Sequence, residues 1–239
     1  MPLYSAVWEG VYQATLTSPE TGLKIQRASW QIQTYCVRVG TLENHIMTLS
    51  RSQQLIIAGL LALLMFMTRG HHFASVDALP SASWAIFFLA GLYLSSAAWF
   101  PVFLVMAAGL DIASVLLGGG QLSTSFCMSP AYGFLIPAYG SLWMAGRWYA
   151  SKYQFNAATL LPLVGSVLVA ATAATLFSGG GFYFFSGRYP DPTFTEYTQR
   201  FIQYFPKNLA VMSFYLVVAM ICHVSLHFTA TTQRADQQH

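Results

Sequence analysis

The chain has 239 residues, of which 55% are hydrophobic and only 8% are charged. Soluble domains carry about 25% charged residues, so this composition excludes an ordinary water-soluble protein and indicates an integral membrane protein. The net charge of +3 is too small to indicate nucleic-acid binding, and the three cysteines, which lack CxxC spacing, indicate neither a zinc site nor a disulfide framework.

Residues 1–46 differ in composition from the rest of the chain. They are polar and mixed, and they lack the basic, apolar and cleavage regions of a signal peptide. Met47 is followed by a short polar stretch and a hydrophobic run, as at an ordinary membrane-protein start. We therefore expect residues 1–46 to be a disordered extension or a mis-assigned start, and residues 47–239 to form the membrane domain.

Apolar segments separated by short polar breaks follow from residue 53 onwards. About 20 apolar residues cross a bilayer. Six segments approach that length, at about 53–69, 83–99, 101–117, 131–149, 157–178 and 206–228. Pro137, inside the fourth segment, predicts a kink. The predicted fold is an all-α integral membrane protein with six transmembrane helices.

Six spans place both termini on one side of the membrane. That side holds seven of the Lys and Arg residues and the other side four, which predicts cytoplasmic termini. Three of the seven lie in residues 1–46. Without them the counts are equal, and the main signal is the basic connection 147–156 against the uncharged connection 118–130. Three connections then face outward: 70–82, 118–130 and 179–205. The last is long and rich in aromatic residues, and we predict that it forms a lid, a re-entrant segment or an interfacial segment.

Few ionisable residues lie in or beside the predicted spans. Asp111 is the only carboxylate within a span, where an acid indicates function by default. It is either held structurally by a Tyr or Ser of a neighbouring helix or in contact with a ligand. His71 and His72, at the outer end of the first span, point about 100° apart on a helix and so rarely share one metal. They are interfacial polar residues, or one of them lines an outward-facing pocket.

Three further patterns admit simple structural interpretations. His223 and His227 have metal-ligand spacing, but no carboxylate or thiol completes a set there, so an interfacial role is favoured. Ala58 and Ala62 form a small-xxx-small pattern, which serves internal helix packing or docking of a partner. Cys222, inside an apolar segment, is predicted to be a small buried hydrophobic residue.

Cys127 lies in the outward connection before the fourth span and is followed by Ser129, Pro130 and Tyr132. Thiolates suit soft or borderline metals, and coordination removes their proton. A single thiol does not hold a bare ion tightly. It can be the axial ligand of a metal already held by a macrocycle, as in haem proteins. The position alone also permits an incidental cysteine.

Two stretches, residues 127–149 (CMSPAYGFLIPAYGSLWMAGRWY) and residues 79–91 (LPSASWAIFFLAG), resemble the BtuM-type proteins. These are solitary cobalamin-specific substrate-binding (S) components of energy-coupling-factor (ECF) transporters, and the resemblance covers about residues 47–230. It implies a six-helix S-component fold that binds cobalamin at the extracytoplasmic face and mediates its uptake across the bacterial inner membrane. It also implies that Cys127 ligates the cobalt and that Tyr132 belongs to the same site.

The resemblance extends to partners. Ala58 and Ala62 are similar to the pattern by which S-components dock on the transmembrane coupling subunit. The chain has no GxxxxGK[ST] motif and cannot hydrolyse ATP itself, so transport needs a shared ATPase module or a route by the solitary protein. We assign His72, Asp111 and Arg188 to the pocket from their positions, not from the resemblance.

Ligation of the cobalt by a thiolate would change the other axial bonds of cobalamin. Two other classes of protein remain open as alternatives. It should displace the lower base of cobalamin and promote loss of an upper cyanide, a thiolate-assisted decyanation. The first alternative is a membrane enzyme with Cys127 as nucleophile and His71 or His72 as base. The second is a haem-binding subunit with His223 and His227 as ligands.

Overall fold

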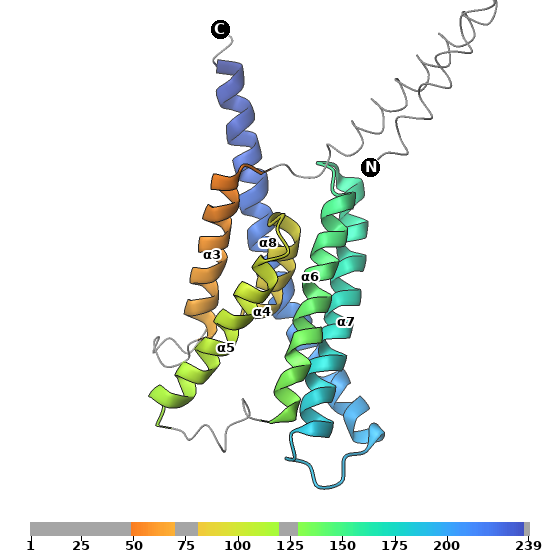
Figure 1. The fold of residues 1–239 in the computed structure, drawn as a ribbon. Coiled ribbons are helices and arrows are strands. Elements are labelled where there is room, and N and C mark those ends of the chain that lie inside the picture. The colour runs from red at the N-terminus through yellow and green to blue at the C-terminus, as the bar shows by residue number, and fades with distance from the viewer. Residues whose placement is uncertain (1–48, 70–80, 120–128, 237–239) are drawn as a thin grey trace, which may run out of the picture. The chain divides into compact units, whose positions relative to one another are not determined.

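The structure is a computed structural model that describes residues 49–69, 81–119 and 129–236. The chain divides into units at residues 1–48 and 49–239, and the described residues all belong to the second. These residues form helices and no strand (Figure 1), which confirms the all-α class. The helices are α3 (Arg51–Arg69), α4 (Ser83–Tyr93), α5 (Trp99–Leu117), α6 (Leu135–Lys152), α7 (Leu160–Phe185) and α8 (Phe194–Asp236), with 3₁₀ turns η3 (Pro130–Phe134) and η4 (Ala157–Thr159).

Four helical segments are long and apolar enough to cross a membrane, as expected of a membrane-embedded protein. They are Arg51–Arg69, Trp99–Leu117, Ala157–Phe185 and Phe194–Leu226. The second predicted span, 83–99, is wrong in length, because α4 ends at Tyr93 and the chain is non-helical until Trp99. Its 11 residues extend about 16 Å, roughly half of a hydrocarbon core. α6 has 18 residues but is less apolar than the four.

Two prolines, one of them predicted to kink a span, are accommodated within helices. Pro137 lies in the first turn of α6, where a missing N–H costs little, and the predicted span 131–149 begins as the η3 turn before α6. Pro206 lies inside α8, which continues through it from Phe194. The long connection predicted at 179–205 is therefore mostly helical, and only residues 186–193 join α7 to α8.

Successive helices alternate in direction, so corresponding ends gather together. The C-terminal ends of α3, α5 and α7 lie at the lower end of Figure 1, with the beginnings of α6 and α8. The α4–α5 connection and the α6–α7 connection lie at the upper end. The described helix ends that flank the connections predicted to face outward thus lie at one end of the helices.

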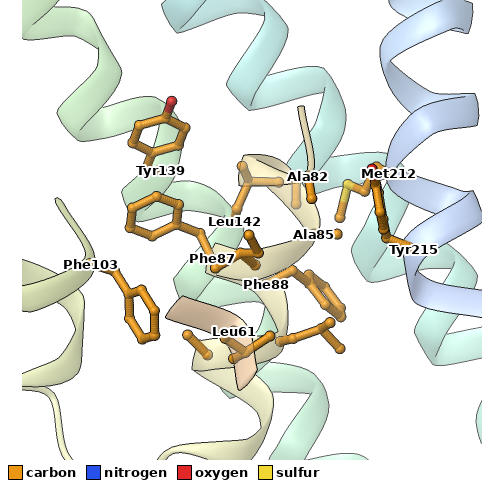
Figure 2. Close-up of a cluster of buried hydrophobic side chains, with 14 of the residues drawn as sticks. Leu61, Ala82, Ala85, Phe87, Phe88, Phe103, Tyr139, Leu142, Met212 and Tyr215 are labelled. Carbon is orange, nitrogen blue, oxygen red and sulfur yellow. The ribbon is translucent and has the colours of Figure 1, made fainter. Parts of the chain in front are cut away.

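The core is built around α4, the short helix. Ile86, Phe87 and Phe88 are fully buried, because α4 is apolar on all sides and is surrounded by other helices. Phe87 stacks on Tyr139 of α6 with ring centroids 4.2 Å apart, and its edge meets Phe103 of α5. Figure 2 shows these rings meeting between three helices. The stacked pair leads directly from the core to the polar site.

α4 and α6 approach closely enough that only glycine fits at their crossing. A Cβ at Gly146 of α6 would overlap the backbone oxygen of Phe88, and a Cβ at Gly91 of α4 would overlap that of Trp143. Small residues allow helix backbones this approach in a membrane, where dispersion between well-packed helices replaces the hydrophobic effect. The crossing holds Tyr139 in its position against α4.

Gly146→Ala is expected to destabilise the protein by about 1–3 kcal/mol, because the added methyl meets backbone that cannot move aside. The matched control is Gly165→Ala on α7, whose added Cβ would have nothing within 4 Å. There the change should be neutral or stabilising by up to about 1 kcal/mol through helix propensity. The measurement is unfolding in detergent, and equal effects at the two positions would contradict the close crossing.

Candidate functional site: a charged network beside an apolar pocket

A buried ion pair marks the lower end of the helices. Arg69, the last residue of α3, donates from Nε and Nη2 to the two carboxylate oxygens of Asp111 on α5, both at 2.6 Å. The side chains are only 11% and 21% exposed. A bidentate pair of this kind fixes both geometry and charge balance, and a charge at such a position is costly without its partner.

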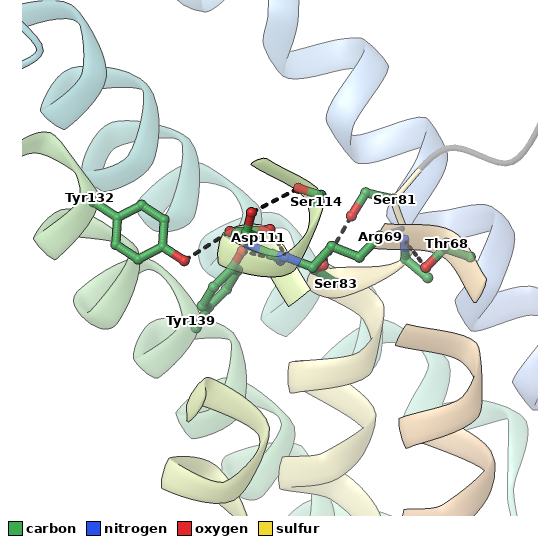
Figure 3. A network of polar contacts seen from close by, with 9 residues as sticks. Thr68, Arg69, Ser81, Ser83, Asp111, Ser114, Tyr132 and Tyr139 are labelled. Carbon is green, nitrogen blue, oxygen red and sulfur yellow. Dashed lines mark hydrogen bonds and ion pairs between the residues drawn. The ribbon is translucent and has the colours of Figure 1, made fainter. Parts of the chain in front are cut away.

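Three more elements converge on this pair (Figure 3). Nη1 of Arg69 donates to Ser83 Oγ of α4 at 2.7 Å and to the hydroxyl of Tyr139 of α6 at 2.8 Å. The hydroxyl of Tyr132, in η3, donates to Asp111 Oδ2 at 2.8 Å. We call Arg69, Ser83, Asp111, Tyr132 and Tyr139 the Arg69–Asp111 network. It joins α3, α4, α5, η3 and α6 at one point.

Hydroxyl groups hold the backbone around the network. Thr68 donates to the carbonyl of Leu64 at 2.8 Å and accepts from the Ala82 N–H at 3.3 Å, which ties the start of α4 to the end of α3. Ser114 donates to the carbonyl oxygen of Asp111 at 2.8 Å. The network is therefore supported by side chains that leave it little freedom to rearrange.

The structure brings together two of the residues assigned to the site from the sequence. Asp111 and Tyr132 are hydrogen-bonded, so the tyrosine partner considered for Asp111 is Tyr132. Arg69 was missed as the ion-pair partner. The sequence did contain a signal for this pair, because Arg69 ends the first predicted span and Asp111 is the one carboxylate in a predicted span. Two opposite charges near the membrane interior are expected to pair.

An apolar pocket of about 230 Å³ lies beside the network, between α5 and the η3–α6 segment. Tyr132 and Tyr139 belong to both, with their rings in the pocket wall and their hydroxyls in the network. Drug-sized ligands take pockets of roughly 300–1,000 Å³, so this one suits part of a large ligand. The lining is Leu104, Val105, Ala107, Ala108, Tyr132, Gly133, Leu135, Ile136 and Tyr139.

The sequence comparisons identify no relative: no protein-family model matches this chain, and no curated protein matches it. Function is therefore inferred from the residues and their geometry.

The other residues assigned to the site lie elsewhere or outside the described residues. Cys127, His71 and His72 fall in the segments 120–128 and 70–80, outside what the structure describes. Arg188 lies on the exposed α7–α8 connection with its guanidinium over the ring of Phe182, 5.7 Å from the centroid. The structure does not bring Arg188 to the Arg69–Asp111 network, because the ring contact and the hydrogen bond of Arg188 are both with residues of α7 and the connection after it.

Two interpretations of α3 and α8 are decided by burial. Ala58 is 4% exposed and packs in the core, so internal packing accounts for it and its methyl is not offered to a docking partner; Ala62 is half-buried. Cys222 is exposed, which corrects the expectation of a buried residue. A membrane helix such as α8 can present apolar residues to lipid as well as to the protein core. The apolar residues beside Cys222 in the sequence therefore did not imply that Cys222 is buried.

His223 has tyrosine hydroxyls at both ring nitrogens. Nε2 is 2.8 Å from the Tyr153 hydroxyl and Nδ1 is 3.4 Å from the Tyr93 hydroxyl. Both ring nitrogens thus lie next to tyrosine hydroxyls, and the side chain of His227 is outside the described residues. The arrangement accords with a structural role at the upper end of the helices.

A second pocket, of about 280 Å³, lies between α7 and the first half of α8. The aromatic richness of this stretch was noted in the sequence, but its folding into a lined pocket depends on the α7–α8 hairpin. The lining is Thr175, Ser178, Gly179, Phe182, Tyr183, Tyr189, Tyr197, Arg200, Phe201, Tyr204 and Asn208. It shares no residue with the first pocket.

Proposed function

We propose that this chain is a cobalamin-binding S-component of the BtuM type, which holds the corrinoid at the extracytoplasmic face and mediates its uptake across the bacterial inner membrane. The supporting observation is the hydrogen bond of Tyr132 to Asp111 within the Arg69–Asp111 network. It ties the stretch that follows Cys127 to a rigid charged centre at the lower end of the helices. A ligand-binding motif needs such a rigid support if its metal ligand is to be held in position.

Covalent geometry limits how far Cys127 can be from this centre. Cys127 precedes Ser129 by two residues, so their Cα atoms are within about 7 Å of each other. Ser129 directly precedes η3, whose Tyr132 lines the apolar pocket. A thiol in this position can reach a metal held over the pocket, and we propose that Cys127 is the axial ligand of the cobalt.

The chemistry of a corrinoid matches the groups around the pocket. Its ring has apolar faces and an amide rim, so a binder needs apolar and aromatic surface, hydrogen-bonding groups and one axial ligand. The α5–α6 pocket supplies the apolar surface, and Tyr132, Tyr139 and the charged network supply polar groups at its side. The pocket is smaller than the ring. In our proposal the ring therefore lies over it, and the outward connections complete the site.

The proposed bond has a defined stoichiometry. The thiol of Cys127 loses its proton to solvent, a Co–S bond forms, and the Co–N bond to the lower base of cobalamin breaks, with no electron transferred. A thiolate is a strong donor, so the ligand on the opposite face of the cobalt is weakened. An upper cyanide then leaves as cyanide ion. We propose no other enzymatic activity.

The membrane arrangement follows the same proposal. All six helices lie in the inner membrane with both termini in the cytoplasm, and the lower end in Figure 1 faces outward. An ECF coupling subunit with its ATPases supplies energy, unless the protein acts alone. Because Ala58 is covered by the chain itself, a coupling subunit would meet the exposed face of α3, with Ala62 at its border.

The direct test is the visible absorption spectrum of protein purified from cells that were fed cobalamin. We expect corrin bands that co-purify with the protein at about one equivalent. Protein that takes up no corrinoid, in cells or on titration, would refute the proposal. A Soret band would instead support the haem-binding alternative. Thiol chemistry that is lost on alkylation of Cys127, without corrinoid binding, would support a membrane enzyme.

A further inference from the structure

The α7–α8 pocket has a polar stripe that the proposed cobalt site does not use. Arg200, Tyr204 and Asn208 follow one another at intervals of four residues, so they lie on one face of α8. Thr175, Ser178 and Phe182 form the opposing wall on α7. Since α7 ends and α8 begins at the same end, Arg200 lies near the mouth and Asn208 about 12 Å deeper along the helix.

Arg200 is held in place by hydrogen bonds that do not use all of its N–H donors. Its Nε and Nη2 donate to Glu196 Oε1 at 3.0 and 2.8 Å, and Nη1 donates to the Tyr189 hydroxyl at 3.2 Å. The guanidinium also lies over the Tyr189 ring, 4.5 Å from the centroid. A guanidinium has five N–H donors, of which these bonds use three, so two remain. Because Glu196 balances the charge, an anion would be recognised by these hydrogen bonds more than by net charge.

Asn208 supplies an unused amide deeper in the pocket. Its side chain makes no hydrogen bond within the described part of the chain, although it lies in a segment apolar enough to cross a membrane. A polar group in such a segment is costly unless it meets a partner. The surrounding wall is aromatic, with Phe182, Tyr183 and Tyr197 among its rings. These features suit a flat heteroaromatic ring with nitrogen or oxygen atoms at its edge.

α7 borders the α7–α8 pocket and also contacts η3, which lines the other pocket. Phe185 stacks on Phe134 of η3 with ring centroids 4.9 Å apart, while Phe182, one turn earlier, lines the α7–α8 pocket. The two pockets are therefore separate hollows with no lining residue in common. A ligand bound at the η3 end would reach the second pocket only with an extended arm.

Cobalamin has such an arm, and the proposed thiolate bond would free it. Displacement of the lower base from cobalt leaves a nucleotide tail that carries a phosphodiester and a bicyclic heteroaromatic base. We propose that the α7–α8 pocket is the subsite for this tail, with the base between the aromatic rings at Asn208 and the phosphodiester at Arg200. This inference rests on the proposed function, because it assigns a second site to the same ligand.

The test compares cobalamin with cobinamide, which has the same ring and amide rim but no nucleotide tail. Asn208→Leu is expected to weaken binding of cobalamin by about tenfold, the scale of one or two lost hydrogen bonds, and to leave cobinamide binding within about twofold of wild type. Arg200→Gln should act in the same direction. The matched control is Gln203→Leu, an exposed amide of α8 outside the pocket, which should change neither ligand.

The outcomes separate this inference from the proposed function. If the wild type binds neither ligand, the proposed function fails and the subsite falls with it. If the wild type binds both ligands and Asn208→Leu weakens both equally or neither, only the tail subsite is refuted. Retained cobinamide binding by the variants also shows that they are folded, so loss of cobalamin binding cannot be attributed to unfolding.

Discussion

Replacing Cys127 by serine is expected to return the visible spectrum of bound cyanocobalamin to that of the free vitamin. In the wild type the Co–S bond should displace the lower base and shift the corrin bands, and a hydroxyl is too poor a donor to do the same. Affinity should fall by at least about tenfold, or about 1.4 kcal/mol, because the axial bond is lost while the apolar and hydrogen-bonding contacts remain. Titration followed by absorption measures both effects.

Cys222→Ser is the matched control for this substitution. Cys222 is an exposed thiol on α8, next to His223 at the upper end of the helices. Its replacement should leave the spectrum and the affinity unchanged. If Cys127→Ser gives the same bound spectrum as the wild type, cobalt ligation by Cys127 is refuted. If only the Cys222 variant changes the spectrum, the ligand lies at the wrong end of the helices and the proposed site is refuted as a whole.

Replacing Arg69 by methionine is expected to destabilise the protein by about 3–5 kcal/mol, because it leaves the carboxylate of Asp111 largely buried without its counter-charge. The double variant Arg69→Met/Asp111→Leu removes both charges and should be more stable than the single variant. Buried ion pairs replaced by apolar side chains of similar size are often neutral. Unfolding by detergent titration measures the free energies.

Arg188→Met is the control for loss of an arginine as such. Arg188 is exposed and in contact with a ring, so its loss should change the free energy of unfolding by less than about 0.5 kcal/mol. Equal losses at Arg69 and Arg188 would contradict the importance of the pair. A double variant less stable than Arg69→Met would show that Asp111 is held mainly by Tyr132 and its other neighbours.

The Arg69–Asp111 network also explains how a site can be held at the end of helices that have few other polar contacts. One guanidinium binds groups from α4, α5 and α6, and the same carboxylate binds η3. η3 is thereby fixed to α5, the helix that precedes it in the chain. In the proposed S-component this rigidity would hold η3, with its pocket-lining Tyr132, in position before the ligand arrives.

Composition and apolar runs by themselves determined the all-α class and the membrane-compatible helices. α3 and α5 match their predicted spans to within two residues at each end, α8 contains its span, and η4 together with α7 covers the span predicted at 157–178. This works because a helix satisfies its backbone hydrogen bonds locally, so a long apolar run with few charges has no other stable form in lipid.

Only the tertiary structure decided which distant residues meet. The pairing of Arg69 with Asp111, the end of α4 at Tyr93 and the pocket at Asn208 all depend on how helices cross. Gly91 and Gly146 set one such crossing, and the α7–α8 hairpin sets another. Crossing geometry arises from contacts between residues far apart in the chain, whereas periodicity and hydropathy report only on neighbours. For that reason the sequence identified Asp111 and Tyr132 one at a time, and the folded chain joined them.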